Sequence, residues 1–168
     1  DSSNPDEYGM IFQVPFDCKV DAIVFTLRSA GATSDLTAYL SSGVSSGAST
    51  RSTLVSVAID AAQLGSTGSQ NYVSVRLASE ITLTANTDYC VSVKATGASD
   101  LRMGRLTLGD GAGRAAFSGG TTLFGVSANN GGEFGAGSTT LMYPIGVRIS
   151  QVSTGSAGGG STAYVIGG

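Results

Sequence analysis

Apolar side chains recur at every second position in short runs, and this pattern constrains the fold of the chain more than any other feature. Within Asn71–Leu77, the alternate residues Val73, Val75 and Leu77 are apolar, and polar or aromatic residues stand between them. A period of two places the two sets on opposite faces of a β-strand, one buried and one exposed. Asp88–Lys94 repeats the pattern, and no run of useful length has the helical period of 3.6. The sequence therefore predicts an all-β protein.

Further runs of this kind predict eight or so short strands, separated by turns rich in Gly, Ser and Asn. The other predicted strands are Gly9–Val14, Lys19–Leu27, Leu36–Leu40, Leu54–Ile59, Leu101–Leu108 and Tyr143–Ile149. Val20 is out of phase with the strand that follows it, and a β-bulge near Asp21 and Ala22 would return it to the core face. Many short strands with such turns indicate an antiparallel two-sheet jelly-roll β-sandwich. We expect its single core to contain Phe12, Phe25, Val57, Val75, Val91 and Val147.

The chain divides into three parts. Residues 1–8 form an N-terminal arm, residues 9–150 the β-sandwich domain, and residues 151–168 a Gly/Ser linker with an apolar tail. The Gly-rich stretch Gly109–Thr140 breaks the rhythm of strands and is predicted to be one long loop. In the tail, Tyr164, Val165 and Ile166 are expected to bind a partner as an added strand. The alternative is a tail that folds back over its own domain.

Composition argues against several classes of function. The 168 residues suit one domain, only 12% of them are charged, and the net charge is −3. Lys19 and Lys94 are the only lysines, so no basic patch is available for nucleic acid or an anionic membrane. No apolar run approaches the ~20 residues that span a bilayer. We therefore expect neither nucleic acid nor a membrane as a partner.

The sequence offers weak support for catalysis. Gly43–Gly47 matches the nucleophile motif G-x-S-x-G around Ser45, but the chain has no His to accept the serine proton. Among the acidic residues, Glu133 is the best candidate for a catalytic carboxylate of a glycosidase, although we favour the interpretation that it is an ordinary loop carboxylate. We expect a protein that is not an enzyme.

Cofactor and metal sites are also not expected. Without His and with two distant cysteines, zinc is improbable. The loop residues that offer oxygen ligands to calcium lack EF-hand spacing, and we interpret them as solvated: Asp100, Asp110, Asn129, Asn130 and Glu133. Cys18 and Cys90 are interpreted as two half-buried thiols, with a single disulfide as the alternative.

Aromatic residues on outward strand positions suggest a carbohydrate site. Tyr39 and Tyr72 are predicted to point outward, and Arg76 shares the face of Tyr72. An exposed aromatic ring stacks on a sugar ring while Arg supplies hydrogen bonds. The competing interpretation is that each Tyr packs under a neighbouring loop.

Several segments carry a family resemblance. They are Tyr8-Gly-Met-Ile-Phe-Gln-Val-Pro-Phe, Val20-Asp-Ala-Ile-Val-Phe-Thr-Leu, Leu36-Thr-Ala-Tyr-Leu and Ile81-Thr-Leu-Thr-Ala-Asn-Thr-Asp-Tyr-Cys-Val-Ser-Val. Together they resemble jelly-roll modules of tailed-bacteriophage virions and extracellular carbohydrate-binding-like domains. The resemblance covers about residues 8–95, with a further segment at Leu141–Ile149, and brings no catalytic residues.

The resemblance implies a structural protein on the virion surface, such as a capsid decoration, head-fibre or tail-appendage protein. Its expected partners are virion proteins, such as the major capsid protein or tail proteins, and further copies of itself. The alternative is a carbohydrate-binding module, extracellular or on a cell surface, with a host surface glycan as its ligand.

Overall fold

The computed structural model describes residues 7–28, 35–43, 51–60, 70–95, 103, 106–107, 124–128 and 141–152. All regular structure in this part of the chain is β, without a helix, as the alternation predicts. The ten strands are β1 (Glu7–Phe12), β2 (Cys18–Arg28), β3 (Leu36–Ser42), β4 (Ser52–Ile59), β5 (Gln70–Leu83), β6 (Tyr89–Ala95), β7 (Leu106–Thr107), β8 (Phe124–Ala128), β9 (Leu141–Met142) and β10 (Ile145–Val152).

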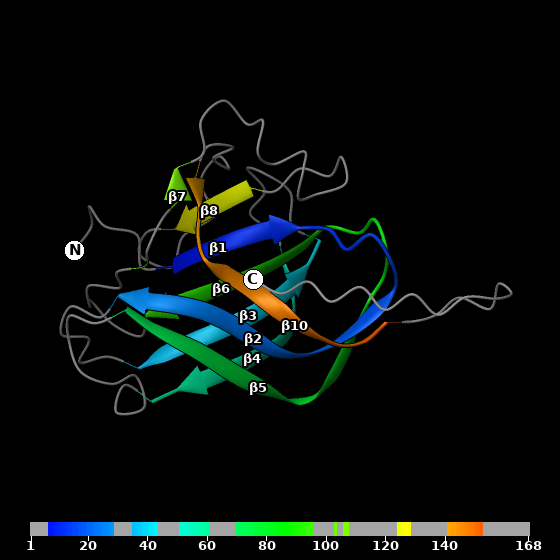
Figure 1. Ribbon diagram of the computed structural model, residues 1–168, viewed down its shortest axis with the longest axis horizontal. Coiled ribbons are helices and arrows are strands. Elements are labelled where there is room, and N and C mark those ends of the chain that lie inside the picture. Colours follow the sequence, from blue (N-terminus) through cyan, green and yellow to red (C-terminus); the bar gives the residue numbers. More distant parts are fainter. Residues whose placement is uncertain are drawn as a thin grey trace, which may run out of the picture.

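Two antiparallel sheets make up the body of the protein (Figure 1). The first has five strands in the order β4-β3-β6-β1-β8, and the second has three in the order β10-β2-β5. A two-stranded ribbon, β7-β9, accompanies them. Three of the antiparallel pairs are nested in sequence, because β3 pairs with β4, β2 with β5, and β1 with β6.

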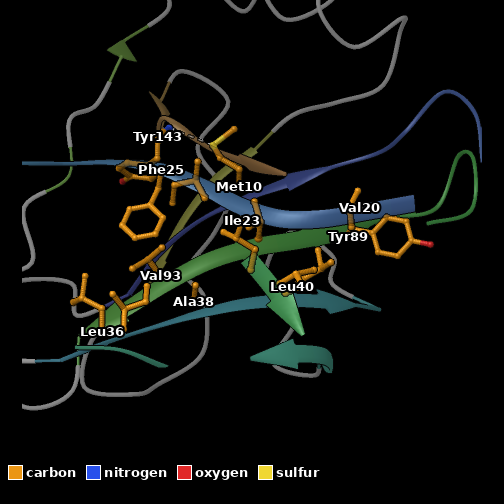
Figure 2. Packing of buried hydrophobic residues seen from close by; sticks show 14 of the residues in the cluster. Met10, Val20, Ile23, Phe25, Leu36, Ala38, Leu40, Tyr89, Val93 and Tyr143 are labelled. Carbon is orange, nitrogen blue, oxygen red and sulfur yellow. Dashed lines mark hydrogen bonds between the residues drawn. The ribbon is translucent and has the colours of Figure 1, made fainter. Parts of the chain in front are cut away.

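The core lies between the two sheets. Phe25 and Ile23 from β2 face Val93 and Leu40 from the five-stranded sheet, and all four side chains are buried (Figure 2). The core predicted from the sequence is confirmed: Phe25 and Val91 are buried in it, and the other four residues pack against it: Phe12, Val57, Val75 and Val147. Each fully buried aliphatic side chain of this kind contributes about 1.5–3 kcal/mol relative to its exposed state.

The predicted bulge in β2 is confirmed at Asp21. Val20 pairs with Ile81 and Ala22 with Arg76, so four residues of β5 lie opposite Asp21 alone. On the other edge of β2, Arg148 pairs with Ala22 and Ile149 with Val20, so Asp21 is an extra residue of β2 relative to β10. This extra residue changes the phase of β2, and Val20 becomes fully buried. Without the bulge, Val20 and Phe25 would point to opposite faces, because successive side chains alternate.

The turn between β5 and β6 explains the polar run in one of the resembling segments. Asn86 has φ 56, a left-handed conformation that Asn tolerates better than most residues. Its backbone N–H donates to the carbonyl of Val14 at 2.9 Å, and that of Ala85 donates to Asp17 Oδ1 at 2.7 Å. These bonds join the β5–β6 turn to the connection between β1 and β2.

Three boundaries differ from the sequence prediction. β1 begins at Glu7, inside the expected arm 1–8, and β10 continues to Val152, inside the expected linker 151–168. β8 lies within the expected loop Gly109–Thr140 and pairs with β1. Each difference comes from backbone pairing with a strand distant in sequence, which side-chain periodicity does not report.

Two other predicted strands, 101–108 and 143–149, differ from the prediction in their extent. Within 101–108, the described residues are Met103, bridged to Leu27, and the short strand β7. Pro144 interrupts 143–149 because it has no backbone N–H, and β9 and β10 lie on either side of it. The carbonyl of Pro144 still accepts a hydrogen bond from the N–H of Thr26 at 3.0 Å.

Candidate functional site

The outer face of the three-stranded sheet brings together two of the predicted sugar-binding residues. Tyr72 and Arg76 lie on β5, both exposed, and Tyr72 is 72% exposed. They share a face because they are four residues apart on one strand, with Ser74 between them. In Figure 1 this sheet is formed by β10, β2 and β5, with β2 in the middle.

Arg148 and Asp21 extend this face across the sheet. Ala22 pairs with Arg76 on one side and with Arg148 on the other, so both arginines flank the same point of β2. Arg148 donates from Nε and Nη2 to the two carboxylate oxygens of Asp21, each at 2.8 Å. Ala22 is fully buried between these long side chains.

Electrostatics link the four side chains. The hydrogen bond from Arg148 lowers the pKa of Asp21, and the charges of Arg148 and Arg76 lower it further. The same hydrogen bond raises the pKa of Arg148, and Tyr72 adds to that effect. The charges of Arg76 and Tyr72 on β5 therefore act on the Asp21–Arg148 pair, which joins the neighbouring strand β2 to β10.

The floor between these side chains is made of small residues. Val24 pairs with Ser74 on β5 and Gly146 on β10, and Thr26 pairs with Tyr72. Gly146 has no side chain, and a Cβ built there would be in ordinary contact with Val24 at 3.8 Å. The result is a low floor with the Tyr72 ring at one end and two guanidinium groups at the other. We call this set the Tyr72 face: Asp21, Val24, Tyr72, Ser74, Arg76, Gly146 and Arg148.

Tyr39, the third predicted sugar-binding residue, is not part of this face. It lies on β3 in the five-stranded sheet, on the side away from the core, since its neighbours Ala38 and Leu40 are buried inside. The guanidinium of Arg51 lies over the Tyr39 ring, 5.4 Å from its centroid. The ring is thus occupied by a cation–π contact. Tyr39 is outward-facing, as predicted, but it lies on the opposite side of the sandwich from Tyr72 and Arg76, because its strand belongs to the other sheet.

Arg51 also makes a buried ion pair that the sequence did not indicate. It donates from Nη1 and Nη2 to the carboxylate of Glu7 at 2.5 and 3.0 Å. Ser92 on β6 donates to the same carboxylate at 2.6 Å, and Glu7 is fully buried. The Glu7 hydrogen bond raises the pKa of Arg51. Every described contact of this cluster is structural, since it ties β1, β6 and the start of β4 together.

The two cysteines are free thiols, as the favoured interpretation expected, but both are fully buried rather than half-buried. Cys18 belongs to the core between the sheets, whereas Cys90 lies on the opposite side of β6 from Val91. Desolvation raises the pKa of the Cys90 thiol to about 12 and also raises that of Cys18. Both thiols are therefore protonated and unreactive at neutral pH.

The remaining candidates are outside the described residues. They are Ser45, the acidic and amide residues of 100–133 considered for calcium or glycosidase chemistry, and the tail residues Tyr164, Val165 and Ile166. Within the part of the chain that is described, no group of three or more His, Cys, Asp or Glu is placed to hold a metal ion. No helix in that part has the length and apolar character that crossing a membrane requires.

Two residues of the Tyr72 face, Asp21 and Arg148, were missed by sequence reasoning. Arg148 stands in an ordinary strand position, and nothing near it in sequence indicates a partner 127 residues away. Asp21 was noticed only as the site of a bulge, and that phase break was the available signal. Comparison with known proteins finds no matching family model, no matching curated protein and no matching solved structure.

Proposed function

We propose that this chain is a non-catalytic structural protein of a phage or virus-like particle, a capsid decoration or appendage protein that acts through protein–protein assembly. The observation that carries the proposal is the position of its exposed large apolar side chains. Four are found among the described residues, namely Leu54, Tyr72, Ile149 and Val152. All four lie on strands at the end of a sheet: β4, β5 or β10.

Ile149 and Val152 are the clearest of these. They pair with Val20 and Cys18, which are fully buried, so they belong to the core-facing side of β10. They are nevertheless 39% and 45% exposed. Apolar residues on an inner face that stay in contact with water are typical of a surface completed by another protein. A neighbouring virion protein or a second copy of this chain would cover them.

The nested strand pairs support the jelly-roll form of the sandwich. In a jelly roll, a long two-stranded hairpin folds over itself, so its successive pairs alternate between the two sheets. The pairs β3–β4 and β1–β6 lie in the five-stranded sheet, and β2–β5, which is nested between them, lies in the other. This is the order that such folding produces. The loop proposed for 109–140 would then be an insertion around β8.

The C-terminal residues Tyr164, Val165 and Ile166 belong to the same proposal, as an added strand on a neighbouring subunit. Deletion of residues 156–168 tests their role. If the tail binds a partner, the shortened protein should keep its melting temperature and lose incorporation into the assembly. Normal incorporation with a lower melting temperature would instead mean that the tail stabilises only its own domain.

The experiment that tests the whole proposal is purification of particles from the source, followed by cryo-electron microscopy. We expect density for this domain on the capsid or tail surface, with Ile149 and Val152 at a subunit contact. The variant Ile149→Ser/Val152→Ser should be released from the particles while remaining folded by circular dichroism. Particles that lack the chain would refute a virion role. Covalent labelling of Ser45 by a fluorophosphonate probe would contradict the non-catalytic part.

The second candidate function is a carbohydrate-binding module, on a cell surface, secreted, or as the receptor-binding part of a tail. The observation that favours it is the Tyr72 ring, which is 72% exposed beside Arg76 and a floor of small residues. Exposed aromatic rings with adjacent hydrogen-bond donors are typical of sugar sites. A glycan array tests this function, and Tyr72→Ala should weaken any binding that it detects.

A further inference from the structure

We propose that the Tyr72 face binds an acidic sugar, with the carboxylate of the sugar on Arg76 and its ring on Tyr72. This inference rests on the carbohydrate-binding function proposed above and names the class of ligand. The observation behind it is the charge balance of the outer face of the three-stranded sheet. The described side chains of this face carry a net positive charge in a protein whose net charge is −3.

Among the described charged side chains of this face, Arg76 is the one that forms no ion pair. Arg148 is paired with Asp21 through two hydrogen bonds of 2.8 Å. Lys19 is paired with Glu80, with 3.6 Å between Nζ and Oε2. Arg76 is exposed and has no hydrogen bond or ion pair with any other described residue. Among the described side chains of this face, three cations (Lys19, Arg76 and Arg148) face two carboxylates (Asp21 and Glu80), so the surplus is one positive charge, on Arg76.

The chemistry of Arg76 selects the anionic group. A guanidinium presents parallel N–H donors that match the two oxygens of a carboxylate. Asp21 acts on Arg76 through its charge without an ion pair between them, because both Asp21 oxygens accept hydrogen bonds from Arg148 at 2.8 Å. Asp21 and Arg148 instead form a fixed, neutral pair beside Arg76. The carboxylate of a ligand would neutralise the guanidinium of Arg76, the only charge without an ion-pair partner among the described residues of this face.

The shape of the face suits a sugar better than a protein side chain. Ser74 separates Tyr72 and Arg76 on β5, and Gly146 keeps the adjoining floor free of side chains. A flat ring can therefore lie against Tyr72 while its carboxylate reaches Arg76. Ser74 and Thr26 offer hydroxyl groups to the ring hydroxyls of a sugar. Neutral sugars would use the ring contact and leave Arg76 without a partner.

A glycan array that pairs each acidic sugar with its neutral counterpart tests the inference on the full chain. The pairs are uronic acid oligomers with their methyl esters, and sialylated galactosides with the same galactosides lacking sialic acid; sulfated galactosides are included. The best pair is then titrated calorimetrically. We expect the carboxylated member to bind about tenfold more tightly, the effect of one charge-assisted hydrogen-bonded pair. That preference should weaken as salt is raised.

Variants separate the role of Arg76 in binding the carboxylate from the role of Tyr72 in binding the sugar ring. Arg76→Gln should remove the preference for the carboxylated member and leave the affinity for the neutral member unchanged. Tyr72→Ala should weaken both members by a similar factor. Lys94→Gln is the matched control, since it removes one positive charge from β6 in the other sheet, and both affinities should stay within about twofold.

Each of the other possible results of these experiments refutes a specific part of the proposal. Equal binding of acidic and neutral members, or an Arg76→Gln effect that is the same on both, refutes the acidic ligand and leaves carbohydrate binding in place. Tighter binding of the sulfated sugars refutes a carboxylate as the recognised group. Silence of the whole array refutes carbohydrate binding together with this inference. If Arg76→Gln then also loses incorporation into particles, the anion on Arg76 belongs to a protein.

Discussion

Removal of the Arg51 side-chain charge should destabilise the protein more than removal of the charge of its partner. Arg51→Gln leaves the Glu7 carboxylate with one hydrogen bond, from Ser92 at 2.6 Å, in place of three. The Glu7 side chain is only 1% exposed, so its charge cannot return to water. Loss of one partner from a buried ion pair costs about 3–5 kcal/mol. The Arg51 side chain is 26% exposed, so water can enter the space that Arg51→Gln leaves beside Glu7. We therefore expect a cost at the lower end of this range, about 3 kcal/mol.

The converse change is milder. Glu7→Gln leaves the guanidinium of Arg51 without its anion, but that group is partly in water and still contacts the Tyr39 ring. We expect a loss of about 1 kcal/mol, close to that of an ordinary hydrogen bond. In the double variant Glu7→Gln/Arg51→Gln, two neutral amides replace the pair. The double-mutant cycle should therefore give a coupling of about 1–3 kcal/mol, since the two residues are in direct contact.

Urea denaturation followed by circular dichroism measures these values. With a slope of about 2 kcal/mol per molar urea, Arg51→Gln should lower the midpoint by about 1.5 M without changing the slope. Glu7→Gln should lower it by about 0.5 M. If Glu7→Gln proves as costly as Arg51→Gln, or if Arg51→Gln costs less than about 1 kcal/mol, the reasoning from burial is wrong.

Three further predictions concern buried positions of the five-stranded sheet, namely Gly9, Ser41 and Cys90. Gly9→Ala should destabilise by about 1–3 kcal/mol, because a Cβ there would lie 2.9 Å from Ser92 Cβ and 3.0 Å from a backbone carbonyl. Gly146→Ala is its control in the same unfolding assay, and we expect a change below about 0.5 kcal/mol because the new Cβ meets only Val24 at 3.8 Å. Ser41→Ala should leave the melting temperature unchanged or raise it, because the buried Ser41 hydroxyl has no hydrogen-bond partner among the described residues. A clear drop would reveal a bond to that hydroxyl. Burial raises the pKa of Cys90 from 9.0 to about 12, so its stabilising effect is complete below pH 9 and is lost as the pH rises toward 12. Cys90→Ala should have a flatter decline in unfolding free energy over that pH range, and rapid labelling of the native Cys90 thiol by a disulfide reagent at pH 8 would contradict its burial.

Alternation of side chains was enough to predict the strands that carry the core. Val73, Val75 and Leu77 turn toward the core while Tyr72 and Arg76 are exposed, as a period of two requires. The phase break at Asp21 also predicted a bulge that the pairing of β2 with β10 confirms. These features depend on residues close together in sequence, where local geometry decides which way each side chain points.

The composition of the candidate site was predicted only in part. Tyr72 and Arg76 are on one strand, so their shared face follows from the sequence. Tyr39 is on another strand with the same outward phase, and the sequence could not tell that this strand belongs to the other sheet. Arg148 was missed for the same reason, since its contact with Asp21 joins strands 127 residues apart.

The sequence alone determined that this chain forms β-strands, which residues of each strand face inward, and where β2 changes phase. The tertiary structure decided which outward residues meet. It put Tyr72, Arg76, Asp21 and Arg148 on one face, and it buried Glu7 beneath Arg51 on the opposite side. The physical reason is that the period of two is a property of one strand, whereas sheet membership and register depend on hydrogen bonds and packing between strands far apart in the chain.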